Sequence, residues 1–524
     1  MFRNHIKIAF RYISKKKVQN FINLVGLICG ITFLMIVGAY IWGAYQVNGD
    51  LRNKDQQYLL QSAYKKEGIG LELTTIGALP KALKKEYPNL VADYYRMDGL
   101  TCIVSNGKDK FEESVNLGDP SLLDMFGFTL HEGNPNTALV DPFSVVLSED
   151  AALKYFGKLQ VIGEVLTISN FQGEKHEFLI TGVIKQNTEN SVIELTPSLH
   201  AHIFLPIASQ EFFARDIDNW NNIYIPGFIE LQPGISAAQL IDPINNLVQK
   251  NKDKEFAENY RAQLKPLKSY YLDDNQGAVR KMINILLWIA GFILLMAIIN
   301  FINFSIAQHI NRLKEIGVRK IMGASAKQIA LLILTENIVL VCLIGLCCIP
   351  IYSVISPLFE QIFLHKLPTI TELPWYFFLT LMAITILIGF LAGIYPAMKL
   401  ANNGILSSVK HQFLRIKTKH IVRHSLLYLQ FTVAIIILIS TVVISKQIQL
   451  FMEGNLGYNK EYLMTVQAPR DWSTTGVRKI ETIQQELTEL PAVESISLSY
   501  ETPNNLITQA KVLKNENSNE DINA

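Results

Sequence analysis

Five long apolar stretches constrain this chain more than any other feature of its sequence. They occupy residues 20–45, 283–307, 329–356, 375–398 and 425–445. Each is at least as long as the roughly 20 apolar residues that cross a bilayer as a helix. The mean hydropathy of +0.20 is also too high for an ordinary soluble enzyme. The sequence therefore predicts a multi-pass membrane protein.

Basic residues are distributed unevenly among the segments that flank these spans. The segment before the first span and the connector 399–424 carry several lysines and arginines and no acid, and the connector 310–328 is also mainly basic. The connector 357–374 carries only Lys366 with two glutamates. By the positive-inside rule, the N-terminus and the basic connectors face the cytoplasm, and the long segment between the first two spans lies outside.

The segment 46–281 mixes helical and strand periodicities, which indicates an α+β domain. We expect helices over 76–87, 149–156 and 236–250, and strands over 144–147, 178–184 and 224–231. The predicted fold class is an α-helical transmembrane bundle of five spans, with a large α+β extracytoplasmic domain inserted between spans one and two. The predicted segments are an amphipathic N-terminal helix (1–19), a span (20–45), the extracytoplasmic domain (46–281), a span (282–309), a cytoplasmic connector (310–328), a span (329–356), a short external loop (357–374), a span (375–398), a basic cytoplasmic connector (399–424), a span (425–446) and the start of a second extracytoplasmic domain (447–524).

A weak internal repeat relates the regions that follow the first and the fifth spans. The strand-like residues 57–61 and the helix-like residues 76–87 correspond to 461–465 and 477–489, and a strand is expected again over 495–500. Because repeats usually pack against one another, we interpret the chain as a two-unit protein that is incomplete in its second half.

The connector 310–328 has the pattern of a short helix, a turn and a new helix. Ile310, Leu313, Ile316 and Ile321 recur at helical spacing. Glu315 precedes Arg319 by four positions, as in a helical ion pair. Gly323 can end this helix, and Ser325 with Gln328 fits a capping box for the next one. The simpler alternative is a solvated basic loop that serves only topology.

Several segments resemble the MacB/FtsX-like permeases of ABC transporters. Residues 312–325 (RLKEIGVRKIMGAS) resemble the segment that couples these permeases to their ATPase, and Asn300–Asn303 resembles part of their second span. Residues 145–163 (VVLSEDAALKYFGKLQVIG) and 180–185 (ITGVIK) resemble their periplasmic core domain. The order of these segments along the chain matches the order in that family.

The resemblance implies a permease subunit in a bacterial cytoplasmic (inner) membrane, coupling ATP hydrolysis on a separate ATPase subunit to movement of the extracytoplasmic domain, for export, efflux or mechanotransmission. It also implies pairing with a second copy or a second permease half. The residues that it assigns to ATPase coupling are Arg312, Lys314, Glu315, Gly317, Arg319, Lys320 and Gly323. Two alternatives are a transmembrane sensor with an extracytoplasmic ligand-binding domain and a non-functional permease fragment.

Two further residue sets lie inside the predicted spans. Gly26 with Gly30, and Gly389 with Gly393, are GxxxG patterns that allow helices to approach closely. Asn300, Asn303, Glu336 and Asn337 are intramembrane polar residues. We expect them to form a buried interhelical hydrogen-bond network, because a single acid among them makes an ion or proton path the less favoured alternative.

Sequence patterns of catalysis are missing from the chain. It contains no G-x-x-x-x-G-K-[ST] loop, no G-x-S-x-G elbow and no H-E-x-x-H pair. His200 and His202 lack a third ligand at suitable spacing, and the five cysteines fit no zinc pattern. We therefore expect no catalytic residue, no cofactor or metal site and no nucleic-acid partner.

Overall fold

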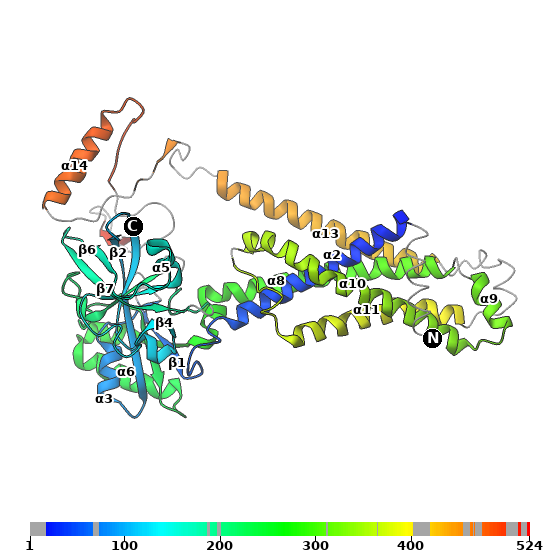
Figure 1. Ribbon diagram of the computed structural model, residues 1–524, viewed down its shortest axis with the longest axis horizontal. Helices are drawn as coiled ribbons and strands as arrows, with labels where there is room; N and C mark the ends of the chain where they lie inside the picture. The colour runs from blue at the N-terminus through cyan, green and yellow to red at the C-terminus, as the bar shows by residue number, and fades with distance from the viewer. Residues whose placement is uncertain are drawn as a thin grey trace. The chain divides into compact units, whose positions relative to one another are not determined.

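The computed structural model describes residues 17–65, 73–185, 189–195, 201–310, 313–363, 365–401, 420–453, 462–464, 466, 474–498, 512–514 and 521–523. The chain divides into two compact units. We call residues 1–45 and 277–463 the helical unit, and residues 46–276 the inserted domain; Met464–Ala524 group with the latter. Figure 1 shows long helices in the first and a strand-rich fold in the second. The predicted N-terminal amphipathic helix lies almost entirely outside the described residues.

Five helices of the described chain are long and apolar enough to cross a membrane. They are α2 (Lys17–Gln46), α8 (Leu267–Ile310), α10 (Ala326–Phe363), α11 (Trp375–Ala401) and α13 (His420–Glu453). Their apolar parts are Leu24–Gln46, Gly277–Ile306, Ala326–Phe363, Trp375–Met398 and Tyr428–Phe451. Together with the mixed α/β domain that follows α2, they confirm the predicted fold class.

All five helices extend beyond the predicted spans, and α8, α10 and α13 do so by the most. Helix α8 begins ten residues before Gly277, inside the inserted domain, and α10 continues to Phe363, so that 357–363 is helical where we expected a loop. Apolar length reports how much of a helix suits lipid. It does not report where backbone hydrogen bonding stops, and polar residues such as Glu360 continue the same helix.

One glycine interrupts the regular geometry of α8. Gly277 has a φ of +71°, and a Cβ built on it would meet no atom within 4 Å. L-residues disfavour this conformation by about 1–2 kcal/mol, whereas glycine adopts it freely. The boundary between the two compact units falls at this residue.

The inserted domain is built on a ten-stranded sheet. Its strands are β1 (Gln57–Tyr64), β2 (Val91–Ser105), β3 (Lys110–Gly118), β4 (Leu130–Gly133), β5 (Ser144–Ser148), β6 (Val165–Ser169), β7 (Lys175–Ile184), β8 (Ile203–Pro206), β9 (Gly227–Leu231) and β10 (Tyr260–Pro266). Its helices are α3 (Leu79–Glu86), α4 (Leu122–Phe126), α5 (Glu149–Phe156), α6 (Ile241–Asn251) and α7 (Lys254–Asn259), with short 3₁₀ turns at Ile207–Ser209 and Ala237–Leu240.

Strand β2 belongs to two substructures. Its first half, up to Arg96, pairs with β9 and continues the open sheet β10-β1-β9-β2. Its second half, from Met97, pairs with β3. Six strands close into a barrel, because the last of them pairs again with β2. The ladders follow the order β2-β3, β3-β8, β8-β5, β5-β7, β7-β6 and β6-β2.

One apolar core fills each substructure, and a third, which includes Phe228 of β9 and Phe204 of β8, spans both. The barrel encloses buried residues from all of its strands, among them Cys102, Val104, Val115 and Phe178. The open sheet packs Leu60 and Ile229 against Leu83 of α3 and Ile244 of α6. Alternating apolar residues on the strands and an apolar stripe on each helix produce these contacts. Cys102, the cysteine of this domain, is a buried packing residue of the barrel core.

A buried guanidinium lies where β2 changes partners. The Arg96 side chain is 1% exposed and donates two hydrogen bonds of 2.9 Å, from Nε and Nη2, to the carboxylate of Asp119, which follows β3. Its Nη1 donates to Gly77 O at 2.9 Å and to Asp218 at 2.7 Å. Lys81 of α3 also binds Asp218. Burial opposes ionisation of Asp218, but the hydrogen bonds from Lys81 and Arg96 lower its pKa below the ordinary value.

The segment after α13 agrees only in part with the predicted repeat. Helix α14 (Thr474–Thr488) forms where a helix was expected. Residues 495–498, expected to begin a strand, are not in a strand. A strand needs a hydrogen-bonding neighbour, and residues 495–498 pair with no other strand in the part of the chain that the structure describes.

Replacing Arg96 with methionine is expected to destabilise the inserted domain by about 3–5 kcal/mol, because Asp119 would keep a buried charge without its partner. The matched control is Arg52→Met. Arg52 binds Asp124 at 2.7 Å, but both side chains are more than half exposed, so this loss should stay below about 1 kcal/mol.

The measurement is alkylation of Cys102 across a urea series, in full-length chain whose other four cysteines are alanine. The thiol reacts only when the barrel opens, so its protection reports the free energy of unfolding. Equal loss of protection in the two variants would contradict a central role for Arg96.

Candidate functional site

The predicted coupling connector folds as a short helix, α9 (Leu313–Ile321). Arg319 Nη2 binds Glu315 Oε1 at 2.8 Å, one helical turn apart. The helix ends at Gly323, whose φ is +93°. Ala324 N–H donates to Arg319 O and Gly323 N–H to Lys320 O, the paired bonds of a Schellman motif, for which glycine is preferred. The predicted helix, ion pair and glycine stop are confirmed.

A capping box begins α10 immediately after this turn. Gln328 N–H donates to Ser325 Oγ at 3.3 Å, and Ser325 N–H donates to Gln328 Oε1 at 2.9 Å. These two bonds satisfy backbone donors that a helix N-terminus leaves unpaired. The turn between α9 and α10 is therefore fixed at both of its ends, as the sequence predicts.

One isoleucine anchors α9 to two membrane helices. Ile316 is 6% exposed and packs with Ile329 and Ile333 of α10 and Ala397 of α11. The adjacent Gly317 is also buried. Contact with the start of one helix and the end of another means that α9 cannot shift without displacing side chains on both.

The opposite side of α9 exposes apolar side chains. Val318, Ile321 and Met322 are 58%, 61% and 83% exposed, and we call these three residues the α9 ridge. Helical spacing grouped Ile321 with Ile316, but the two side chains do not share a face of α9. Five residues correspond to 500° of helical rotation, or about 140° beyond a full turn. Val318 and Met322 were missed because isolated apolar residues in a basic segment give no periodic signal.

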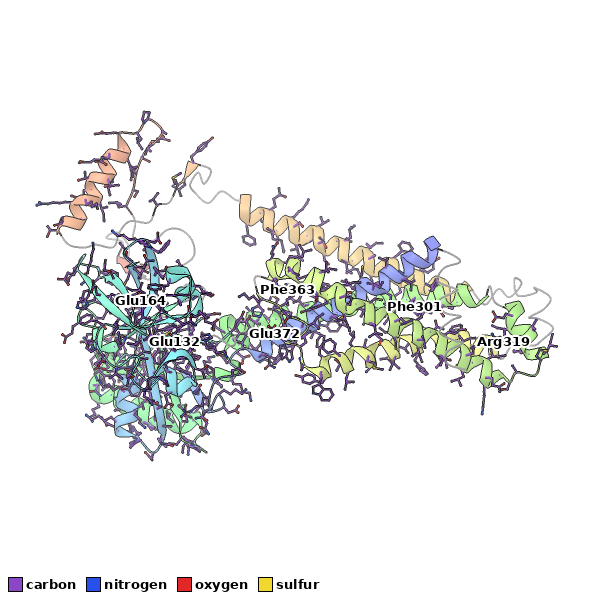
Figure 2. The ribbon with its side chains drawn as sticks, in the orientation of Figure 1. Glu132, Glu164, Phe301, Arg319, Phe363 and Glu372 are labelled. Carbon is purple, nitrogen blue, oxygen red and sulfur yellow. The ribbon has the colours of Figure 1, made fainter. Side chains whose placement is uncertain are left out.

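Most of the charged residues predicted to take part in ATPase coupling lie on α9 together with this ridge. Figure 2 shows Arg319 on α9 at the end of the helical unit opposite Phe363 and Glu372. Glu315 is exposed, and Lys320 is half-buried, which lowers its pKa from the usual lysine value. Lys314 belongs to α9. Arg312 lies outside the described residues.

Three of the four GxxxG glycines lie at helix crossings. A Cβ on Gly389 of α11 would come within 2.6 Å of Ile338 Cα on α10, and one on Gly393 within 3.3 Å of Asn337. A Cβ on Gly30 of α2 would meet Ala297 of α8 at 3.0 Å. Gly26 has open space around it. These glycines therefore serve contacts within the chain, where small residues let backbones approach.

A polar contact joins α8 and α10 beside this crossing. Ser305 Oγ donates to Asn337 Oδ1 at 2.9 Å, and Asn337 Nδ2 donates to Ile333 O at 2.8 Å. Glu336 is buried and Asn303 half-buried, but Asn300 is exposed. The buried stripe of α8 follows Ala290, Ala297, Phe301 and Ser305, and Asn300 lies about 100° away from Phe301. Ser305 was missed because a lone serine in a span carries no distinctive pattern.

The other candidate positions lie in ordinary structural contacts. His202 Nδ1 lies 3.0 Å from Ser148 Oγ, which also caps α5 by accepting from Ala151 N–H. His200 lies outside the described residues. Within the described residues, no three His, Cys, Asp or Glu side chains gather as metal ligands.

Comparison with known proteins agrees with this architecture. The MacB-like periplasmic core domain matches residues 20–247, and the FtsX-like permease C-terminal domain matches residues 287–405. No curated protein matches the chain.

Three similar solved structures each match about two fifths of this chain. A domain of a protein described as a permease from Porphyromonas gingivalis is 23% identical (TM-score 0.34; 41% of this chain, 93% of that one). The periplasmic region of MacB from Actinobacillus actinomycetemcomitans is 12% identical (TM-score 0.30; 41% and 90%). The extracellular domain of the noncanonic ABC-type transporter YknZ from Gram-positive bacteria is 15% identical (TM-score 0.29; 40% and 99%).

The helix crossings give a matched pair of glycine substitutions. Gly389→Ala should destabilise the helical unit by about 1–3 kcal/mol, because the new methyl group meets the backbone of α10. Gly26→Ala, which adds the same methyl group in open space, should change stability little. Thermal unfolding of detergent-solubilised chain, followed by fluorescence-detected size-exclusion chromatography, would test this. Equal melting temperatures would show that α10 and α11 do not depend on this close approach.

Proposed function

The chain belongs to the MacB/FtsX-like permeases of ABC transporters, and from this premise we propose that it couples ATP hydrolysis on a separate cytoplasmic ATPase to movement of its inserted domain. The observation that carries this proposal is α9, a capped helix with one face anchored in the helical unit and the other exposed. The chain itself supplies the mechanical parts, and ATP hydrolysis takes place on the partner.

The charge distribution supports an inward-facing α9. The N-terminal segment 1–19 and the connectors 310–328 and 399–424 are basic, and all three lie at the same side of an alternating five-span topology. This topology puts the inserted domain and the 365–374 loop on the other side. We therefore propose a bacterial cytoplasmic membrane with the N-terminus and α9 in the cytoplasm.

The α9 ridge has the composition of a docking surface. Apolar side chains exposed on a short helix, with Glu315 and Arg319 beside them, combine an apolar centre with a charged rim, which is the usual anatomy of a protein interface. Met322 is the most exposed of the three ridge residues, and methionine adapts its shape readily to a partner surface. We propose that the partner ATPase covers this ridge.

Ile316 would carry force from the docked ATPase into the membrane helices. It packs against α10 and α11 together, and these two helices cross closely at Gly389 and Gly393. A tightly packed contact transmits displacement because its side chains have no free volume to absorb it. Movement of α9 would therefore tilt α10 and α11 as a pair.

Replacing the ridge methionine with a charge tests the docking step. Met322→Asp should abolish co-purification with the partner ATPase and should remove stimulation of its ATP hydrolysis, because burying a carboxylate in an apolar contact is costly. The matched control is Met322→Leu, which keeps an apolar side chain of similar size at the same position and should preserve co-purification.

Glu315→Ala with Arg319→Ala should weaken the same interaction while leaving the chain folded, since an exposed i,i+4 pair contributes only about 0.5 kcal/mol or less to stability. If both variants retain full co-purification and full stimulation, α9 is not the docking element.

Gly277 would let the inserted domain move relative to the membrane helices. Gly277→Ala should favour ordinary helical geometry at this position, because alanine disfavours a positive φ by about 1–2 kcal/mol. Gly291→Ala is the matched control, since Gly291 also lies in α8 with open space around it but has no positive φ.

Pulsed electron paramagnetic resonance would compare the variants in lipid nanodiscs, with spin labels at Lys254 and Leu346 in a chain whose exposed cysteines are replaced. The distance distribution should shift and narrow only in Gly277→Ala. Identical distributions in all three proteins would exclude Gly277 as the joint.

A further inference from the structure

The inserted domain contains a pocket of about 270 Å³ at the base of α8. Strands β1 and β10 form one wall, and the first turns of α8 form the other. Its polar lining includes Gln61, Gln263, Lys265, Tyr270, Asp273 and Asp274. The volume lies just below the range of about 300–1,000 Å³ that is usual for small-molecule sites. It therefore suits a compact ligand.

Two glutamines lie side by side on the strand wall of this pocket. Gln61 on β1 and Gln263 on β10 are directly opposite in the antiparallel register. Gln61 is only 6% exposed. Within the described residues, neither side-chain amide makes a hydrogen bond to the protein. Gln263 is exposed, so the two amides are open to the pocket and can hydrogen-bond to a polar ligand there.

Opposite charges line the two walls. Lys265 lies two residues after Gln263, on the same face of β10, and makes no ion pair among the described residues. Asp273 and Asp274 lie on the α8 wall. The nearby Lys268 is already paired with Asp55 at 2.7 Å and does not line the pocket. The pocket thus offers Lys265 and the two amides on the strand wall, and two carboxylates on the α8 wall.

We propose that this pocket binds a small zwitterion of the amino-acid or dipeptide class. Its carboxylate would bind Lys265, its ammonium group would bind Asp273 or Asp274, and its peptide or carboxyl oxygens would satisfy the Gln61 and Gln263 amides. A neutral sugar would satisfy the amides but would leave both charged walls unused. Charge-assisted hydrogen bonds at both ends of the ligand would make the site prefer a zwitterion to a neutral molecule.

Occupation of the pocket would also connect β10 to the part of α8 that precedes Gly277. Residues Tyr270 to Asp274 lie within the last two turns before that glycine. A ligand held between both walls would stabilise the position of this helical segment on the inserted domain. The proposal concerns ligand binding by this chain alone and does not depend on the ATPase.

Isothermal titration calorimetry of the full-length chain in nanodiscs tests the site, with L-alanyl-L-alanine as the probe. Two comparison compounds separate the chemical classes: N-acetyl-L-alaninamide keeps the amides without charge, and D-glucose offers only hydroxyl groups. We expect saturable binding of the dipeptide alone. Lys265→Met should weaken that binding at least about tenfold, because it removes a charge-assisted bond, whereas Lys268→Met should leave it unchanged.

Gln263→Leu provides a second variant that keeps the size of the side chain and removes its amide, and it should also weaken binding. If the dipeptide gives no saturable heat at concentrations up to about 10 mM, any affinity is weaker than millimolar. That result would overturn the proposal. So would equal binding of the neutral amide or of glucose, or equal losses in the two lysine variants.

Discussion

The inserted domain depends on one buried guanidinium. Arg96 is the last residue of β2 that pairs with β9. Its side chain binds Asp119, which follows β3, and Asp218, which lies between β8 and β9. A long strand shared between an open sheet and a barrel could bend freely at that point. The ion cluster fixes the bend, because each carboxylate is held by hydrogen bonds with defined directions. The apolar core that includes Phe228 and Phe204 also joins the open sheet to the barrel.

The helical unit is held together by different physics. Lipid provides no hydrophobic driving force between helices, so close packing and interhelical hydrogen bonds determine how they associate. Gly389 and Gly393 bring α11 against α10, Gly30 brings α2 against α8, and Asn337 receives the hydroxyl of Ser305 between α8 and α10. Rigid crossings of this kind suit a subunit whose proposed task is to transmit displacement rather than to form a passage.

The two ends of that proposed transmission differ in rigidity. At α9, Ile316, the Schellman turn and the capping box define a single arrangement. At the junction with the inserted domain, Gly277 leaves α8 with one residue of unusual φ and no packing around it. The packed contact at α9 would receive force from a partner, and the glycine would allow the inserted domain to rotate. The proposed zwitterion pocket is lined by residues that come just before this glycine, so ligand binding there would influence the start of α8.

The sequence by itself determined the five membrane helices, the α+β character of the inserted domain, and the α9 turn with its ion pair and caps. Each of these depends on local signals, such as apolar length, alternation, or a glycine and a serine at fixed spacing, that act within a few residues. Tertiary structure alone decided that β2 closes a barrel, that Arg96 meets Asp218, that Ser305 binds Asn337, and that Gln61 lies beside Gln263. These contacts join residues distant in the chain, and many alternative pairings satisfy the same local pattern. The errors have the same origin: Ile321 and Asn300 were assigned by approximate periodicity, but burial depends on which neighbouring helix occupies each face.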